Sequence, residues 1–207
     1  MNAVAILIHG YNVSDPRQTV GKIRPYLEDL GVLVENYTYG YWPLPIQVSR
    51  RNDQFAAEVA ERCQYWKSKG FTVYLVGHSN GCVIARTACL TYGAPVDRIL
   101  AIHPALKRHL SICGLAERII VVHNQGDLAV VAGGLLGRLT ALFMPKWESA
   151  RPWGEMGQDG YQGPSSNHIN IDSASRDYSV KCWGHSDEFS EKKKQYWLTI
   201  LTKALTE

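Results

Sequence analysis

Short apolar runs alternate along the chain with longer amphipathic stretches, and this alternation predicts a parallel sheet flanked by helices. The first, third and fifth runs are almost continuously apolar, which is typical of central strands that helices cover on both faces. The expected strands are Ala3–Ile8, Val32–Tyr39, Thr72–Val76, Arg98–Ile102, Arg118–His123 and His168–Ile171.

Four of the intervening stretches have helical patterns. The stretch Asp15–Leu30 opens with a capping Asp followed by Pro and stops before a glycine, although Pro25 would kink it. In Ser49–Lys69, apolar residues recur every three or four positions. The other two expected helices are Ser79–Leu90 and Glu188–Leu205.

The segment 132–166 does not follow this pattern. It contains seven of the eighteen glycines and three prolines, which is too many for a long regular element. Insertions of this kind form lids or pocket walls, or are plain surface loops. We therefore expect one domain over residues 1–207, with a lid or pocket wall at about 132–166 as one of the two interpretations of that segment.

Composition narrows the class of protein. At 207 residues the chain is long enough for one well-buried core. Hydrophobic residues make up 45% and charged residues 20%, close to globular averages, which excludes disordered, collagen-like and coiled-coil chains. The 22 basic residues exceed the 19 acidic ones by a net charge of +3, too little for the basic surface that binds nucleic acid. No nucleic-acid partner is expected.

The apolar runs and the cysteines indicate the cellular compartment of the protein and whether it binds a metal. We expect no membrane span, because no apolar run approaches 18 residues, and no cleaved secretion signal, because a basic region and cleavage site are missing. The five cysteines are odd in number and widely spaced, which fits reduced thiols in a cytoplasmic protein. Cys182 and His185 have a metal-like spacing, but no second pair completes a zinc site. No metal or cofactor is expected.

The strongest chemical signal is the motif Gly77-His78-Ser79-Asn80-Gly81, which follows an apolar strand and opens a helix. This context matches a nucleophile elbow, a sharp strand-to-helix turn that exposes a serine. The two glycines provide clearance where Cβ atoms would collide with the adjoining strand and helix. The alternative is a chance match, since the pentapeptide occurs in roughly one chain of this length in fifteen. The context favours Ser79 as a nucleophile.

A serine nucleophile needs a base. The predicted base is His185, which lies on a glycine-bearing turn before the last expected helix, where its imidazole can reach the carboxyl edge of the sheet. His168 is the alternative. The other histidines are interpreted as structural residues or as residues that support the catalytic groups without acting on the substrate: His9, His78, His103, His109 and His123.

The base needs an orienting acid. Asp127 follows the apolar strand Arg118–His123 at a turn, on the sheet edge where catalytic groups of open α/β sheets gather. The preceding strand ends in Ile102-His103-Pro104 without an acidic residue. Asp127 is therefore the predicted acid and Asp172 the alternative. The non-functional interpretation of Asp127 is a turn-forming Asp after a glycine.

The oxyanion of acyl transfer needs two backbone N–H donors. One is expected from Asn80, the residue after the nucleophile, and the other from Tyr11 in the loop after the first strand. Gly10 allows a tight turn in this loop. Nucleotide-binding glycine motifs are absent from the sequence.

Together these residues resemble the α/β-hydrolases, which use the chain order Ser, Asp, His. The resemblance covers most of the chain except 132–166 and implies a minimal α/β-hydrolase fold. That fold has a mostly parallel central sheet of about six strands, with helices on both faces and the order 4-3-5-6-7-8 in the family's numbering. The sequence starts at the family's third strand, without the N-terminal hairpin. The motif His9-Gly10-Tyr11-Asn12-Val13-Ser14 also resembles the start of small lipase-like serine esterases.

The resemblance implies a serine hydrolase that cleaves a carboxylic ester or thioester through an acyl-enzyme on Ser79. Two alternatives are an acyltransferase that uses the same triad and a binding module without turnover. The expected partner is a small-molecule acyl ester. The sequence does not indicate which ester it is, nor the oligomeric state of the protein. Loop residues that can line an acyl pocket, or can equally be ordinary packing, are Trp42, Met144 and Trp153, together with Trp147, Met156 and Trp183.

Overall fold

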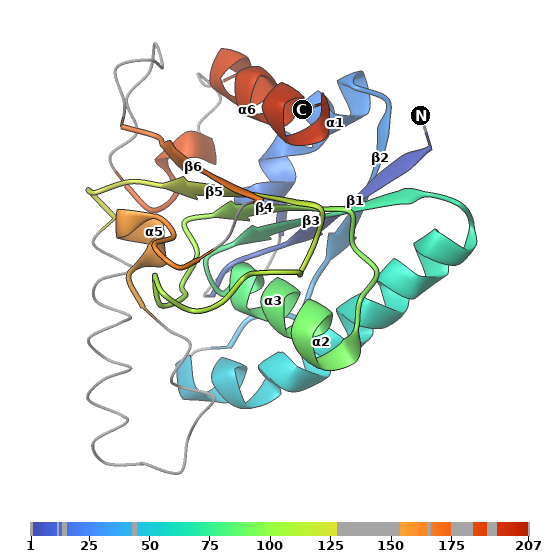
Figure 1. Cartoon of the computed structure of the whole chain (residues 1–207), viewed down its shortest axis with the longest axis horizontal. Helices are drawn as coiled ribbons and strands as arrows, with labels where there is room; N and C mark the ends of the chain where they lie inside the picture. Colours follow the sequence, from blue (N-terminus) through green and yellow to red (C-terminus); the bar gives the residue numbers. More distant parts are fainter. Residues whose placement is uncertain are drawn as a thin grey trace.

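In the computed structural model, the described residues form one sheet of six parallel strands with helices on both faces (Figure 1). The structure describes residues 2–11, 13, 16–42, 45–127, 154–164, 167–174, 184–189 and 194–206. The strands are β1 (Ala3–Ile8), β2 (Val32–Tyr37), β3 (Thr72–His78), β4 (Arg98–Ile102), β5 (Arg118–His123) and β6 (His168–Asp172). The helices are α1 (Arg24–Asp29), α2 (Pro45–Ser68), α3 (Asn80–Tyr92), α5 (Met156–Asp159) and α6 (Lys194–Thr206).

The strand order is β2-β1-β3-β4-β5-β6, and every neighbouring pair is parallel. This is the order that the α/β-hydrolase resemblance implies, so the predicted fold class is confirmed. In the register, His78 pairs with Ile102, and His123 pairs with Asp172. All carboxyl ends therefore lie at one edge of the sheet, toward the left in Figure 1. Loops that follow different strands can meet there.

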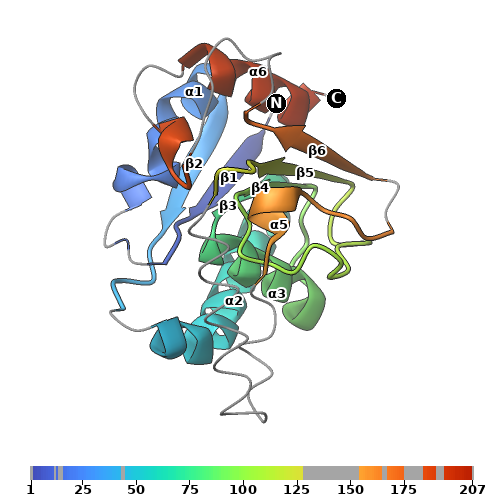
Figure 2. The same cartoon turned by 90° about the vertical axis from the view of Figure 1, so that its left-hand side faces the viewer.

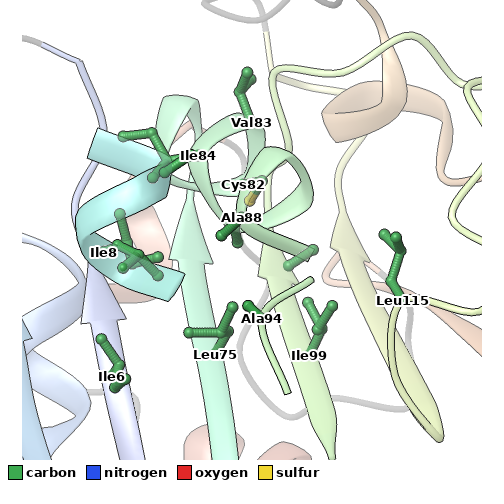
Figure 3. Close-up of a cluster of buried hydrophobic side chains, with 14 of the residues drawn as sticks. Ile6, Ile8, Leu75, Cys82, Val83, Ile84, Ala88, Ala94, Ile99 and Leu115 are labelled. Atoms are coloured by element: carbon green, nitrogen blue, oxygen red, sulfur yellow. The ribbon is translucent and has the colours of Figure 1, made fainter. Parts of the chain in front are cut away.

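Side chains of each central strand alternate between two buried cores. In β1, Val4, Ile6 and Ile8 pack toward α2 and α3, and the intervening Ala5 and Leu7 pack toward α1 and α6. Figure 3 shows part of the first core, where Cys82 and Ala88 of α3 face the strands that carry Ile8, Leu75 and Ile99. Because both faces are covered, these strands are apolar at nearly every position, which is why the sequence predicted them so well.

Three helix predictions need correction. The expected helix Asp15–Leu30 is instead two 3₁₀ turns, Pro16–Gln18 and Val20–Ile23, followed by α1. Pro25 lies in the first turn of α1, where its missing N–H costs no helix hydrogen bond. Farther inside a helix the same proline would remove a hydrogen bond, so the regular α-helix begins only at Arg24. Helix α2 begins at Pro45, four residues earlier than Ser49. The expected C-terminal helix is divided into a 3₁₀ turn, Asp187–Phe189, and α6.

The described end of the unusual segment packs against the sheet. In Figure 2, α5 lies beside the ends of β4 and β5. Met156 N donates to Leu106 O at 2.8 Å, and Asn124 N donates to Gly157 O at 2.9 Å. The remainder of 132–166 lies outside the described residues, so the lid or pocket wall and the single domain stay predictions. No described helix is both long enough and apolar enough to cross a bilayer.

Helix α3 approaches β1 closely at Gly81. A Cβ atom at this position would overlap the carbonyl oxygen of Ile8 and would lie 2.8 Å from the carbonyl oxygen of His9. Both obstacles are backbone atoms, which cannot rotate away as a side chain can. The glycine therefore sets how close the first turn of α3 lies to the end of β1.

We predict that Gly81→Ala lowers the free energy of unfolding by about 3 kcal/mol or more, because the added methyl group forces α3 away from β1. Gly93→Ala is the matched control, since Gly93 has open space around it and a φ of +61°. That change should cost only about 1 to 2 kcal/mol of backbone strain. Denaturant unfolding of both variants measures the difference, and a smaller loss at Gly81 than at Gly93 would contradict the packing argument.

Candidate active site

Ser79 lies on a strained turn between β3 and α3. Its φ of 54° and ψ of −116° place it in a region that residues other than glycine rarely adopt. Ser79 N donates to the carbonyl oxygen of Ile102 at 3.0 Å, which ties the turn to β4. The Ser79 carbonyl oxygen accepts from Cys82 N at 3.1 Å. Neighbouring backbone thus holds the strained conformation.

Glycines surround this turn for steric reasons. A Cβ atom at Gly77 would lie 2.8 Å from Cys82 N, within the turn itself. A Cβ atom at Gly10 would lie 2.9 Å from His78 Nδ1 and 3.0 Å from Ser79 Cβ. The loop after β1 therefore lies directly against Ser79, so the backbone near Tyr11 is close to the serine.

Asp127 and His185 are hydrogen bonded, although 58 positions separate them in the chain. His185 Nδ1 lies 2.8 Å from Asp127 Oδ2; the side chain of Asp127 is fully buried, and that of His185 is 23% exposed. With Nδ1 occupied by the carboxylate, Nε2 is the ring nitrogen available for proton transfer. This is the arrangement of a general base with its orienting acid.

His185 also lies beside the serine turn. Its ring centroid is 4.7 Å from that of His78, the residue before Ser79, and its carbonyl oxygen lies 2.8 Å from His78 Nε2. Burial, and then the proximity of His185, lower the pKa of His78 well below its usual value. The His78 ring is therefore neutral and donates from Nε2, because a carbonyl oxygen can only accept.

Among the described residues, no hydrogen bond joins Ser79 Oγ to His185. Catalytic hydrogen bonds of unliganded enzymes are often long and become short only when substrate binds. The bond from His78 Nε2 to the His185 carbonyl oxygen ties the segment that carries His185 to the serine turn.

The ionisation of Asp127 depends on its two imidazole neighbours. Burial by itself raises the pKa of this carboxyl group. Hydrogen bonds from His103 and His185 outweigh burial and hold the pKa well below its usual value. Asp127 is therefore a carboxylate at neutral pH, and both Nδ1 atoms that face it are donors.

Asn80 is anchored through its side chain, a feature that the sequence did not suggest. Asn80 and Asn52 of α2 exchange two amide hydrogen bonds of 3.0 Å each. Asn80 Nδ2 also donates to Tyr39 Oη at 3.4 Å, and Tyr39 Oη donates to the carbonyl oxygen of His9 at 3.2 Å. This buried network connects the start of α3 with the loop that contains Tyr11. It links the two backbone segments predicted to form the oxyanion hole.

The two alternative residues do not join this group. His168 starts β6 and pairs with Ile119 near the start of β5, at the opposite edge of the sheet from Ser79. Asp172 lies at the carboxyl edge, but its Oδ1 accepts from Ala174 N at 2.9 Å in a local turn. Of the two acids, only Asp127 contacts the His185 ring in the described part of the chain.

Two of the six predicted pocket residues, Trp42 and Met156, lie within the described part of the chain. Trp42 is half-buried, donates from Nε1 to the Tyr39 carbonyl oxygen at 2.9 Å, and is stacked under the guanidinium of Arg51 at 4.3 Å. Met156 is fully buried in the core with α3 and lines a small cavity beside Gly77, so its place in an acyl pocket stays a prediction. The other candidates lie outside the described residues: Met144, Trp147, Trp153 and Trp183.

The sequence interpretation missed His103 and Glu188 as members of this site. Both are fully buried, and the His103 ring bridges Asp127 and Glu188 with contacts of 2.7 and 2.6 Å. The sequence predicts a structural or supporting role for His103, and for Glu188 only the start of a helix. The only sequence signal was the position of His103 directly after a buried strand.

In the described part of the chain, His103, Asp127 and His185 form the one group with three possible metal-ligand atoms within 4.8 Å. Both imidazoles already donate from Nδ1 to the same oxygen of Asp127. A cation would have to displace both protons, so the geometry favours a hydrogen-bonded cluster. Cys182, which has a metal-like spacing from His185, lies outside the described residues.

Comparison with known proteins gives a clear result for structure only. No family model matches the sequence, and no curated protein matches it either. Solved structures do match. A protein assigned to the α/β superfamily of hydrolases, from Xanthomonas campestris pv. campestris, is 19% identical with a TM-score of 0.55; the match covers 97% of this chain and 99% of that one.

Two other matches are a lipase and a protein with a bound ligand. A Bacillus licheniformis lipase in its mature form is 12% identical with a TM-score of 0.57, over 100% of this chain and 93% of that chain. Est1E from Butyrivibrio proteoclasticus with bound ferulic acid is 12% identical with a TM-score of 0.58, over 99% and 90%. At these identities the likeness concerns the fold. Together with the strand order and the turn at Ser79, it shows that this chain has the α/β-hydrolase fold.

Proposed function

We propose that the protein is a serine esterase that cleaves a carboxylic ester or thioester through an acyl-enzyme on Ser79. The observation that carries this proposal is the hydrogen bond between the buried Asp127 and the partly exposed His185, next to a serine on a strained strand-to-helix turn. Structural neighbours that include a lipase and a ferulic-acid complex of Est1E support the reaction class. Cytoplasmic location stays a prediction.

The first half-reaction acylates the serine. Ser79 Oγ attacks the carbonyl carbon of the ester while His185 Nε2 accepts the hydroxyl proton. The tetrahedral intermediate then expels the alcohol or thiol, which takes the proton from the His185 imidazolium. The products are an ester on Ser79 Oγ and a free alcohol or thiol.

The second half-reaction returns the enzyme to its starting state. Water attacks the acyl carbon as His185 Nε2 accepts a proton, and the acid leaves as Ser79 Oγ regains that proton. In both halves a positive charge develops on His185, and the carboxylate of Asp127 stabilises it. Backbone N–H groups of Tyr11 and Asn80 are proposed to stabilise the oxyanion, and Trp42 to line the entrance for the acyl group. An alcohol or amine in place of water would give acyl transfer.

Replacement of the nucleophile tests this proposal. We expect Ser79→Ala to abolish hydrolysis of p-nitrophenyl acetate while the melting temperature stays near that of the wild type. The control is Ser111→Ala, which replaces an exposed serine in the loop between β4 and β5 and should keep full activity. Equal rates for the wild type and Ser79→Ala would contradict the mechanism. Product analysis with added alcohol then separates hydrolysis from transfer.

A second pair of variants tests the acid. Asp127→Asn keeps the shape of the side chain but disrupts the orientation of His185 and removes the charge that stabilises its imidazolium, so kcat should fall by about 10³ to 10⁴. Asp172→Asn retains an oxygen for its local turn and should cost less than about tenfold. Steady-state kinetics beside melting temperatures measure both. Near-wild-type kcat for Asp127→Asn together with a large loss for Asp172→Asn would reverse the assignment.

A further inference from the structure

His103 occupies an unusual place directly after β4. It has a φ of +46°, and its side chain is completely buried. Nδ1 lies 2.7 Å from Asp127 Oδ2, and Nε2 lies 2.6 Å from Glu188 Oε1. Both carboxyl side chains are themselves fully buried. Each ring nitrogen thus faces a carboxyl oxygen that water does not reach.

The contacts of His103 with two carboxylates favour one protonation state of its ring. A neutral imidazole has one N–H and one lone pair, so it can donate to only one of two carboxylates, and its lone pair would repel the other. An imidazolium donates to both. A cation between two buried carboxylates also offsets much of the cost of burying their charges. The geometry therefore favours a protonated His103.

Glu188 connects this cluster to the segment 184–189, which carries His185. Its Oε1 also accepts from Ser173 Oγ at 2.8 Å, and its carbonyl oxygen accepts from Trp197 Nε1 at 2.7 Å. Together with the bond between His78 and the His185 carbonyl, these contacts attach the segment to residues at or after the ends of β3, β4, β5 and β6.

We propose that His103 is a positioning residue: as an imidazolium between Asp127 and Glu188, it holds both the acid and the 184–189 segment in the geometry that His185 needs. The proposal rests on the proposed esterase function. His103 does not touch the substrate. Its effect reaches the reaction through Asp127 Oδ2, which it shares with His185, and through Glu188.

The surrounding charges determine the pH at which His103 loses its proton. Burial acts to lower its pKa, but hydrogen bonds and charges from Asp127 and Glu188 outweigh burial and raise the pKa to about 9. The other titratable groups that interact with it are His78, His123 and His185. Since the folded pKa exceeds the usual 6.5, the stabilisation is complete below about pH 6.5 and is lost as pH rises through about 9.

The pH profile of esterase activity should then have an alkaline limb. Activity should fall near pH 9 as His103 loses its proton and its contact with one carboxylate becomes repulsive. In Glu188→Gln, the side-chain amide can donate to the lone pair of a neutral His103, so loss of the His103 proton produces no repulsive contact, and the alkaline limb near pH 9 should be lost. The ratio of variant to wild-type kcat/KM should therefore rise by about tenfold between about pH 7 and pH 10.

The test is the pH dependence of p-nitrophenyl acetate hydrolysis by the wild type, Glu188→Gln and the control His168→Gln, which removes a histidine at the opposite sheet edge. The control should keep the wild-type limb. A general packing defect in Glu188→Gln would lower activity at every pH without removing the limb, and that result would overturn the proposal.

Nitrogen NMR of the wild-type protein gives a second measurement that needs neither activity nor a folded variant at this site. At pH 7, His103 should show two protonated ring nitrogens that titrate near pH 9. A single protonated nitrogen between pH 6 and 8 would refute the imidazolium. If the wild type hydrolyses no ester at any pH, the proposed function fails, and the NMR titration still decides the state of His103.

Discussion

The two hydrogen bonds that Asp127 accepts at one oxygen organise the candidate site. A buried carboxylate is costly unless donors surround it, and here His103 and His185 provide them from different loops. Because the same oxygen receives both bonds, the position of the proposed base depends on the placement of His103. Glu188 connects His103 back to the segment of the base, since it is hydrogen bonded to His103 and lies three residues after His185. A change at one member should therefore affect the others.

The parallel sheet makes this arrangement possible. Ser79, His103, Asp127 and Ser173 all follow strands, and parallel strands bring their carboxyl ends to one edge. Backbone strain is concentrated at the same edge, because Ser79 and His103 are the only residues other than glycine with positive φ in the described part of the chain. Contacts with Ile102 and Asp127 hold these two residues in place.

Much of the fold was predictable from the sequence, because buried parallel strands are apolar at nearly every position and glycines mark the turn at Ser79. Helix ends were less predictable: α1 begins at Arg24, with Pro25 in its first turn, where one continuous helix from Asp15 to Leu30 was expected. In the site, Asp127 and His185 followed from chain order and sheet edges. The partnership of His103 with Glu188 spans 85 positions and depends on tertiary packing, so no local pattern indicates it.

The central claim is that this framework activates Ser79 as a nucleophile. Reaction of the wild-type protein with a fluorophosphonate, followed by mass spectrometry of its peptides, tests the claim without knowledge of the substrate. An activated serine should form one covalent adduct per chain, on the peptide that contains Ser79. Absence of an adduct on a folded protein, or an adduct only on another residue, would contradict the account.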